Sequence, residues 1–347
     1  MMSNRVGLPK LFKYFFGLSV LATLCIAEVS APALRSFEGV EPHMGTLVRI
    51  QLYAGDAGSA ESAFRAAFDR ISQLDGALSD YKPDSELNRL SQSAVNRPVK
   101  VSEDLFHVLE TAQSVAVRTD GAFDVTLGPL THLWREARKQ GHVPEARALR
   151  QAASHCGYRK LHLDRANRTV LLDEAAMQLD LGGIAKGYAA DEALAVLKKT
   201  GYRSALVAAS GDLAFSDPPP GRRGWGIGID SLDAAGQPFT STLTIANAAV
   251  STSGDSEQHL DYRDKRYSHI IDPRTGMGLT NGLTVTVVAP TGIESDANST
   301  AASVLGCKLG LAFIENQPRL AALFVERTIG RSHLLESTRF HKIGDMN

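Results

Sequence analysis

Several of the strand-like segments in this chain are separated by short turns, and this feature constrains its fold most. Short turns join antiparallel strands, whereas parallel strands need crossovers of a dozen residues or more. Residues 161–172, for example, read as a strand interrupted by a turn at 164–168. Helical segments are interleaved with the strands. We therefore expect an α/β (α+β) fold with mixed, largely antiparallel sheets and packed helices, and not a doubly wound parallel sheet.

Apolar spacing and capping residues predict the individual elements. The expected helices are 59–78 with Ser59 as N-cap, a short helix capped by Asp84 or Ser85, and 102–118, 145–154, 187–200 and 294–305. The expected strands are 46–53, the two arms of 161–172, and 178–181, 205–209, 225–229, 243–245, 250–253, 268–271, 283–289 and 321–326. No internal repeat or clear linker divides them, so we expect one large domain.

The N-terminal segment differs in composition from the rest of the chain. Three basic residues precede an apolar, uncharged run at 14–26, and residues 31–33 (Ala-Pro-Ala) form an A-x-A-like cleavage site. This order is typical of a secretory signal peptide, and the run is shorter than a membrane-spanning helix. We expect a signal peptide at 1–33, a folded domain at 34–347 and an exported, periplasmic protein. A retained signal that anchors the domain to the outer face of the inner membrane stays an open alternative.

Charge and cysteine content exclude some classes of function. The formal net charge of −1 argues against a nucleic-acid partner, which would require a basic surface. Outside the expected signal, the cysteines are Cys156 and Cys307, too few for a disulfide framework. One bridge and two buried thiols both fit the sequence. The chain also lacks the G-x-S-x-G and H-E-x-x-H motifs of hydrolases.

Residues 179–187 (LDLGGIAKG) place paired glycines immediately before an expected helix. Gly182 and Gly183 allow a ligand to approach the backbone, and the helix start offers N–H groups at the positive end of its dipole. Lys186 adds a mobile positive charge. Together they predict a pocket for a phosphate or another anion. The spacing is neither the dinucleotide fingerprint nor the P-loop, so a tight turn with a surface lysine is the alternative.

Asp296 and Thr300 lie at positions i and i+4 of an expected helix and therefore share one face. A carboxylate and a hydroxyl in this arrangement suit a hard cation that prefers oxygen ligands, such as Mg²⁺. The alternative is a capping acid and a solvated threonine, which are common on helices.

Three further segments carry residues that could contact a ligand. His269 precedes a turn in which Asp272 and Arg274 could position the loop, although a lone histidine is more often structural. Asp124 follows an aromatic residue and could accept hydrogen bonds from a heterocycle. Tyr81 lies in a polar turn, where an aromatic ring is exposed unless it stacks on something. For each of these residues a plain structural role is the alternative.

The order of these segments resembles the ApbE family of FAD:protein FMN transferases. The matching segments are MGT (44–46), SDYKPDSELNRL (79–90), GAFDVTLGPL (121–130), LDLGGIAKGYAAD (179–191), VSTSGD (250–255), YSHIIDPRTG (267–276) and APTGIESDANSTAASVLG (289–306). The resemblance implies an ApbE-type, T-fold-like single large domain. It also implies a Mg²⁺-dependent transferase that splits the pyrophosphate of its substrate FAD. FMN would be joined to a Thr or Ser of an acceptor flavoprotein, such as a subunit of a membrane redox pump, and AMP would be released.

The resemblance also implies roles for individual residues. FAD contacts are implied for Met44, Tyr81, Ala122, Phe123, Asp124, Asp180, Lys186 and Ile271. Mg²⁺ ligands are implied in the backbone carbonyl of Gly183, the carboxylate of Asp296 and the hydroxyl of Thr300. His269 would lie by the reacting phosphate and take the proton of the acceptor hydroxyl, with Asp272 as a support. Lys186 would help to neutralise the phosphate charge.

Two departures from the family pattern and two rival functions accompany this hypothesis. Ser210 stands where the family usually has glycine, and Asn298 stands where an apolar residue is more common. The first rival is a Mg²⁺-dependent FAD pyrophosphatase, which would use the same site with water as the acceptor. The second is a non-catalytic FAD-binding assembly protein. The sequence identifies neither the acceptor protein nor the oligomeric state.

Overall fold

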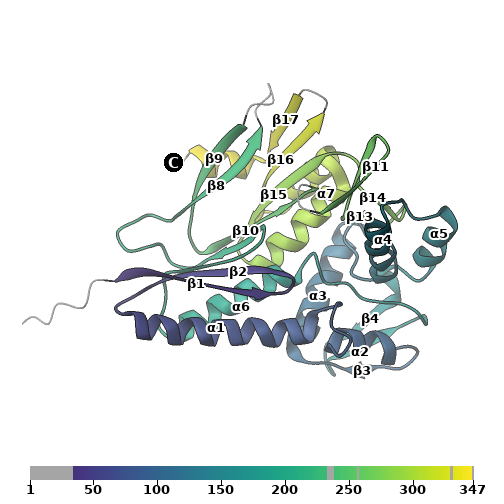
Figure 1. Ribbon diagram of the computed structural model, residues 1–347, viewed down its shortest axis with the longest axis horizontal. Coiled ribbons are helices and arrows are strands. Elements are labelled where there is room, and N and C mark those ends of the chain that lie inside the picture. Colours follow the sequence, from purple (N-terminus) through teal and green to yellow (C-terminus); the bar gives the residue numbers. More distant parts are fainter. Residues whose placement is uncertain (1–33, 233–237, 256–257, 329–330, 346–347) are drawn as a thin grey trace, which may run out of the picture. The chain divides into compact units, whose positions relative to one another are not determined.

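The short turns of the sequence join strands of an eight-stranded sheet in which every neighbouring pair is antiparallel (Figure 1). The strands, in their order across the sheet, are β1 (Arg35–His43), β2 (Thr46–Ala54), β6 (Ala205–Ala209), β7 (Asp212–Phe215), β10 (Ala248–Ser253), β15 (Leu283–Ala289), β16 (Ala321–Thr328) and β17 (Arg331–Glu336). The expected α+β fold with largely antiparallel sheets is confirmed.

The computed structural model describes residues 34–232, 238–255, 258–328 and 331–345. These residues belong to one compact unit that begins at Leu34. The expected signal peptide lies outside the described residues and stays a prediction.

The described residues also form four smaller sheets. They pair β8 (Trp225–Leu232) with β9 (Pro238–Ile245), β11 (His259–Tyr262) with β12 (Lys265–Ser268), β13 (Ile271–Asp272) with β14 (Met277–Gly278), and β5 (Thr169–Leu172) with both β3 (Val99–Lys100) and β4 (Leu161–Asp164). The interrupted strand expected at 161–172 is the β4–β5 hairpin.

The helices are α1 (Ala57–Leu78), α2 (Glu86–Ser93), α3 (Glu103–Arg118), α4 (Gly128–Gln140), α5 (Ala146–Ser154), α6 (Ala185–Lys199), α7 (Gly292–Glu315) and α8 (Thr338–Asp345), with a 3-10 turn at Tyr158–Lys160. Two expected caps are confirmed, since Ser85 and Ser102 accept hydrogen bonds from the third residue beyond them. The cap predicted at Ser59 is wrong. Asp56 caps α1 instead and accepts a hydrogen bond from the Ser59 amide at 2.9 Å.

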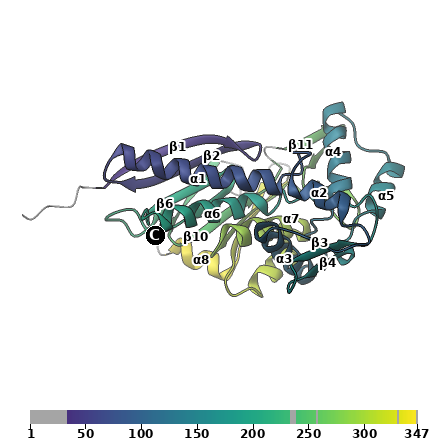
Figure 2. The ribbon, with the colours of Figure 1, turned by 90° about the horizontal axis from the view of Figure 1, so that it is seen from below.

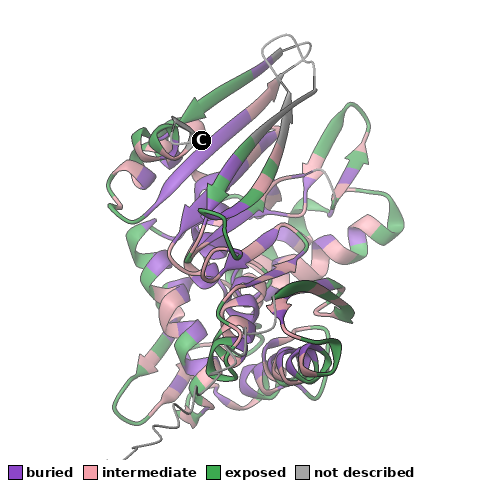
Figure 3. Ribbon diagram, turned by 90° about the vertical axis from the view of Figure 1, so that its left-hand side faces the viewer, coloured by how far each residue is buried: buried purple, intermediate pink, exposed green. Residues whose placement is uncertain are grey.

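Each face of the large sheet is covered by different elements (Figure 2). Helices α1, α6 and α7 pack on one face, and the β8–β9 ribbon and α8 contact strands on the other. Successive side chains of β10 point to opposite faces of the sheet. Ala249 accordingly belongs to the core beneath the helices, and Val250 belongs to the core beneath the β8–β9 ribbon. Buried residues accordingly run along the strands of the sheet (Figure 3).

Helix α7 is buried around most of its circumference, with small residues such as Ala297 and Ala301 in contact with its neighbours. Among the described residues it is the one helix long and apolar enough to cross a membrane, but it packs on α6, β10 and β15 as a core helix does. The helix is broken at Gly306, whose φ of 76° and ψ of 176° are not helical. The expected helical end at 305 therefore coincides with this break.

Two predicted strands differ from the structure, and one helix of the structure was not predicted. Residues 178–181 make no strand, and Gln178 forms an isolated bridge with Leu127. The strand predicted at 268–271 is divided, because β12 ends at Ser268 and β13 begins at Ile271. Helix α4 was not expected, since its N-cap Leu127 carries no side chain that could accept a hydrogen bond.

Candidate functional site

The paired glycines form a compact turn that leads directly into α6. Asp180 closes the turn through its Oδ1, which accepts a hydrogen bond from the Gly182 amide at 2.7 Å. The amides of Ile184 and Ala185 both donate to the carbonyl of Leu181, at 3.0 and 2.9 Å. The turn therefore fixes the orientation of the Gly183 peptide at the start of the helix.

Helices α6 and α7 cross at two glycines with almost no space between their backbones. A Cβ atom built on Gly187 would lie 2.1 Å from the carbonyl oxygen of Gly292, and one on Gly292 would lie 2.3 Å from that of Gly187. This close approach lets the Gly187 amide donate to Oδ2 of Asp296, at 3.1 Å. Asp191 on α6 accepts hydrogen bonds from the amides of Gly292 and Ile293, at 2.6 and 2.9 Å, and so caps α7. The crossing thus fixes Asp296 beside the glycine turn.

Lys186 lies between two carboxylates at this crossing. Its Nζ is 2.7 Å from Oδ2 of Asp212 and 4.0 Å from Oδ2 of Asp296. Burial works to lower the pKa of Lys186, but the charges of Asp212 and Asp296 outweigh it and raise the pKa, so the ammonium is retained. Burial, followed by repulsion from Asp212, raises the pKa of Asp296 to about 7. The predicted phosphate contact of Lys186 therefore competes with two internal partners.

Asp212 is a site residue that the sequence reasoning missed. It is 5% exposed and begins β7 directly after the Ser210–Gly211 turn. That turn was identified by the departure at Ser210, whose φ of 59° is the left-handed conformation that glycine adopts most easily. The ion pair with Lys186 joins positions 26 residues apart, and local spacing gives no signal for it.

The three predicted metal ligands come together beside the crossing. Asp296 and Thr300 lie one turn apart on α7, and a Cβ atom built on Gly183 would lie 3.0 Å from Oγ1 of Thr300. Ser253 on β10 adds a hydroxyl 3.4 Å from Oγ1 of Thr300 and 2.7 Å from Oγ of Ser299. The donors are a carbonyl, a carboxylate and hydroxyls, which is the chemistry that a hard cation such as Mg²⁺ prefers. The residues present therefore fit such a cation.

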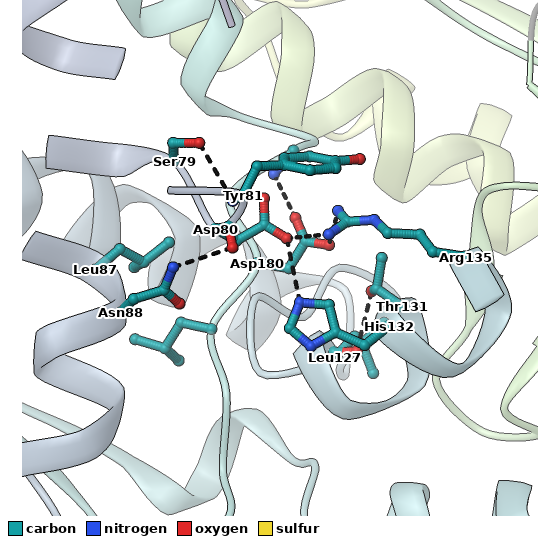
Figure 4. A network of polar contacts seen from close by, with 12 residues as sticks. Ser79, Asp80, Tyr81, Leu87, Asn88, Leu127, Thr131, His132, Arg135 and Asp180 are labelled. Atoms are coloured by element: carbon teal, nitrogen blue, oxygen red, sulfur yellow. Dashed lines mark hydrogen bonds and ion pairs between the residues drawn. The ribbon is translucent and has the colours of Figure 1, made fainter. Parts of the chain in front are cut away.

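A second cluster surrounds Tyr81 and Asp180 (Figure 4). Arg135 of α4 forms ion pairs with Asp80 and, at 3.1 Å, with Oδ2 of Asp180. Its guanidinium carbon lies 4.0 Å from the centre of the Tyr81 ring. Burial works to raise the pKa of Asp80, but hydrogen bonds from His132 and Arg135 hold it below its usual value. Burial, followed by the charge of Asp80, raises the pKa of Asp180.

Arg135 was not identified from the sequence because its helix was not expected. Tyr81 is nonetheless 70% exposed, as the sequence predicted for an aromatic residue in a polar turn. Asp180 contacts both this cluster and the glycine turn, since its two carboxylate oxygens accept from Arg135 and Gly182. The Tyr81 cluster and the glycine turn are therefore parts of one site.

The segment 122–124 contacts the glycine turn through Phe123, but Asp124 has a structural environment. Its Oδ1 accepts hydrogen bonds from the amide and hydroxyl of Thr126, and its Oδ2 accepts from the Tyr158 amide at 2.8 Å. Burial raises the pKa of Asp124. Phe123 approaches the turn more closely, because a Cβ atom on Gly183 would lie 3.3 Å from its ring. The predicted FAD contact of Asp124 stays untested beside these internal bonds.

Met44, the remaining predicted contact outside this region, lies in the two-residue turn between β1 and β2. Met44 and Gly45 both have positive φ, 51° and 73°, as a tight hairpin loop requires. The Met44 side chain is partly buried against the main core. The structure therefore shows a packing role for it, and its contact with FAD stays a prediction.

The His269 segment joins the site through its neighbours. Ile270 packs with Ala122 and with Val304, which lies one turn beyond Thr300 on α7. Nδ1 of His269 lies 3.1 Å from the carbonyl oxygen of Gln258. Because a carbonyl can only accept, this contact places the proton on Nδ1 and makes Nε2 the acceptor nitrogen of the neutral ring.

The turn after His269 is held by its own residues and by α4. Asp272 accepts hydrogen bonds from the amide and the guanidinium of Arg274, at 3.0, 2.9 and 2.8 Å. Ile271 is buried and packs in one cluster with Trp134, whose indole N–H donates to the carbonyl of Gly276 at 2.8 Å. Asp272 therefore shapes the loop, and its predicted support of His269 stays a prediction.

The two cysteines do not form a bridge. Cys156 and Cys307 are both free thiols of intermediate exposure. Burial raises the pKa of Cys156 to about 12, and burial also raises the pKa of Cys307. Of the two alternatives left by the sequence, the structure supports two separate thiols.

The fold and the site define a class of protein in which oxygen donors, a partly buried lysine and an exposed tyrosine lie around a glycine turn. The chain belongs to the ApbE family, whose model matches residues 44–324. It is 34% identical to the FAD:protein FMN transferase of Treponema pallidum over 307 residues, which cover 84% of this chain and 85% of that protein.

Two solved structures are similar over almost the whole described chain. The flavin transferase ApbE from Vibrio cholerae has a TM-score of 0.82 and 27% identity, and the match covers 90% of this chain and 100% of that one. The apo form of the flavinyl transferase ApbE from Pseudomonas stutzeri has a TM-score of 0.79 and 29% identity, covering 90% and 97%. The resemblance recognised in the sequence motifs is thereby confirmed, and so is the single large domain.

Proposed function

We propose that this chain transfers the FMN moiety of FAD to a Thr or Ser hydroxyl of an acceptor protein and releases AMP. Membership in the ApbE family and the name of its relatives support this activity. The structural observation that carries it is the meeting of the glycine turn, Lys186 and the α7 oxygen donors at one helix crossing. Such a site is built for charge neutralisation, which phosphoryl transfer needs more than covalent help.

The reaction exchanges one phosphorus–oxygen bond for another. The acceptor oxygen bonds to the phosphorus of the FMN half, the bond from that phosphorus to the bridging oxygen breaks, and AMP leaves with this oxygen. The hydroxyl proton must be removed, and Nε2 of His269 is the candidate base because the Gln258 carbonyl holds the proton on Nδ1. Tyr81 is exposed beside Arg135, so an aromatic part of FAD can stack on its ring.

Mg²⁺ is the metal that we propose for this site. The carbonyl of Gly183, the carboxylate of Asp296 and the hydroxyl of Thr300 would hold it. The charges at the crossing support a bound cation, because Asp212 and Asp296 share the single ammonium of Lys186. When bound, Mg²⁺ neutralises pyrophosphate charge and makes the phosphorus more electrophilic. Lys186 then serves chiefly to hold the two carboxylates in place.

We further propose that the protein is exported to the periplasm and that its acceptor is a flavoprotein subunit of a membrane redox pump. The basic residues, apolar run and A-x-A-like site of residues 1–33 support export. N-terminal sequencing of protein isolated from the cell envelope tests it. A mature chain that starts after residue 33 supports a cleaved signal, an intact N-terminus at the membrane supports an anchor, and intact protein in the cytoplasm refutes export.

The transferase activity is tested by incubating the protein with FAD, Mg²⁺ and an acceptor that carries an accessible threonine. Intact-mass spectrometry should show the acceptor gaining the mass of one FMN ester, with an equal amount of AMP released. Release of FMN and AMP without a gain by a competent acceptor would instead identify a pyrophosphatase. FAD that is bound but stays uncleaved would identify a binding protein.

A further inference from the structure

Arg135 contacts two parts of the site that are far apart in the sequence. Its side chain is only 15% exposed, and the two carboxylates that it pairs with are still more buried, at 6% for Asp80 and 10% for Asp180. Asp80 adjoins Tyr81 in the polar turn, whereas Asp180 holds the Gly182 amide. A single guanidinium therefore links the Tyr81 turn to the glycine turn.

The same guanidinium lies over the Tyr81 ring. The guanidinium carbon lies 4.0 Å from the ring centre, so one face of the ring is covered by a planar cation. Tyr81 is nevertheless 70% exposed as a residue, which leaves surface for a second flat group to stack. Figure 4 shows the Arg135 side chain extending toward both aspartates, with Tyr81 next to it.

A lysine could neutralise the two aspartates but could not take over the stacking. An ammonium is a compact charge, whereas the guanidinium is planar and can pair with carboxylates while it lies against an aromatic face. The residue at position 135 therefore has two separable functions, which are to neutralise Asp80 and Asp180 and to hold the Tyr81 ring. Arg→Lys removes the second while keeping the charge required for the first.

We propose that Arg135 is a positioning residue that presents the Tyr81 ring for stacking on an aromatic ring of FAD. The proposal rests on the proposed function, because it takes FAD as the ligand. Arg135 pairs with both aspartates, keeps the Tyr81 ring in one orientation and so lowers the entropy lost when FAD stacks. The residue acts through Tyr81 and needs no contact of its own with FAD.

A double-mutant cycle tests this coupling. The dissociation constant for FAD is measured by quenching of flavin fluorescence, in EDTA so that FAD is not consumed, for the parent, Arg135→Lys, Tyr81→Ala and the double variant. We expect Tyr81→Ala to weaken binding about 10- to 100-fold and Arg135→Lys about fivefold. The double variant should bind FAD no more weakly than Tyr81→Ala alone, because the arginine has no ring left to orient.

Controls separate positioning from folding. Arg150→Lys on the exposed surface of α5, outside the site, should leave the affinity for FAD unchanged. In the transfer assay, Arg135→Lys should raise KM for FAD by a larger factor than it lowers kcat. An unchanged affinity in Arg135→Lys, or a double variant weakened by the product of the two single effects, would overturn the proposal.

The outcomes also distinguish this inference from the proposed function. A parent protein that binds FAD but modifies no acceptor fails as a transferase, while the cycle still decides the role of Arg135. A parent protein that binds no FAD overturns both.

Discussion

Replacing Gly187 by alanine should separate the two helices that carry the site. The new Cβ would lie 2.1 Å from the Gly292 carbonyl oxygen, and ordinary contacts begin at 3.4 Å, so the helices must move apart by roughly 1.3 Å. Overpacking of this kind costs about 1–3 kcal/mol. The movement also breaks the buried hydrogen bond from the Gly187 amide to Asp296, which adds roughly 1–3 kcal/mol. We therefore expect a total destabilisation of about 2–6 kcal/mol.

Urea unfolding followed by circular dichroism measures this loss, and Gly76→Ala provides the matched control. Gly76 is exposed within α1, and a Cβ atom there meets nothing within 4 Å. The control should therefore stabilise the protein by about 0.5–1 kcal/mol, as Gly→Ala does in an open helix. The same substitution thus has opposite signs at the two positions. A Gly187→Ala protein as stable as the parent would refute the close crossing, and full transferase activity would refute its role in placing Asp296.

Three further predictions concern residues around the crossing and the thiols. Asp296→Asn should abolish Mg²⁺-dependent turnover without lowering Tm. The amide oxygen of the new side chain can still accept a hydrogen bond from the Gly187 amide, and the repulsion between residue 296 and Asp212 disappears. Substantial Mg²⁺-dependent turnover in this variant would show that Asp296 is not a metal ligand. Asp191→Ala should cost about 1–2 kcal/mol in urea unfolding, because both hydrogen bonds that cap α7 are lost, whereas Asp191→Asn keeps one accepting oxygen for the two amides; an Asp191→Ala protein as stable as the parent would contradict a capping role. Cys156 should react with maleimide at pH 7.5 far more slowly in the native protein than in urea, because burial raises its pKa to about 12; rapid native labelling would contradict that environment.

The sequence predicted those elements whose signals are local. The strand at Ala205–Ala209 and the strand at Leu283–Ala289 agree with their apolar runs at both ends, and α3 begins after the predicted cap Ser102. Helix α4 was missed because its N-cap has no capping side chain and its start lies within the segment read as a ligand motif. The strand predicted at 178–181 failed because its apolar residues are buried by packing in the core, without a ladder partner.

In the candidate site, too, the sequence predicted the residues with local signals and missed those brought together by tertiary packing. The i, i+4 spacing of Asp296 and Thr300 placed them on one face of a helix, and the paired glycines indicated the turn beside them. Asp212 and Arg135 could not be found in this way, because their partners Lys186 and Asp180 are brought close only by tertiary packing. The spacing of residues in the sequence indicates which side chains are neighbours within one helix or strand. It does not indicate which charged side chains from other helices or strands pack beside them.

The break in α7 at Gly306 has a consequence for how this chain tolerates change. In an uninterrupted helix, one inserted residue rotates everything beyond it by about 100° relative to the core. Here the helical register ends at Gly306, whose conformation is non-helical and whose Cβ position faces open space. A residue inserted between Cys307 and Glu315 should therefore disturb the packing of the buried Gly310 and Ile314 while leaving the orientation of Asp296 and Thr300 unaltered.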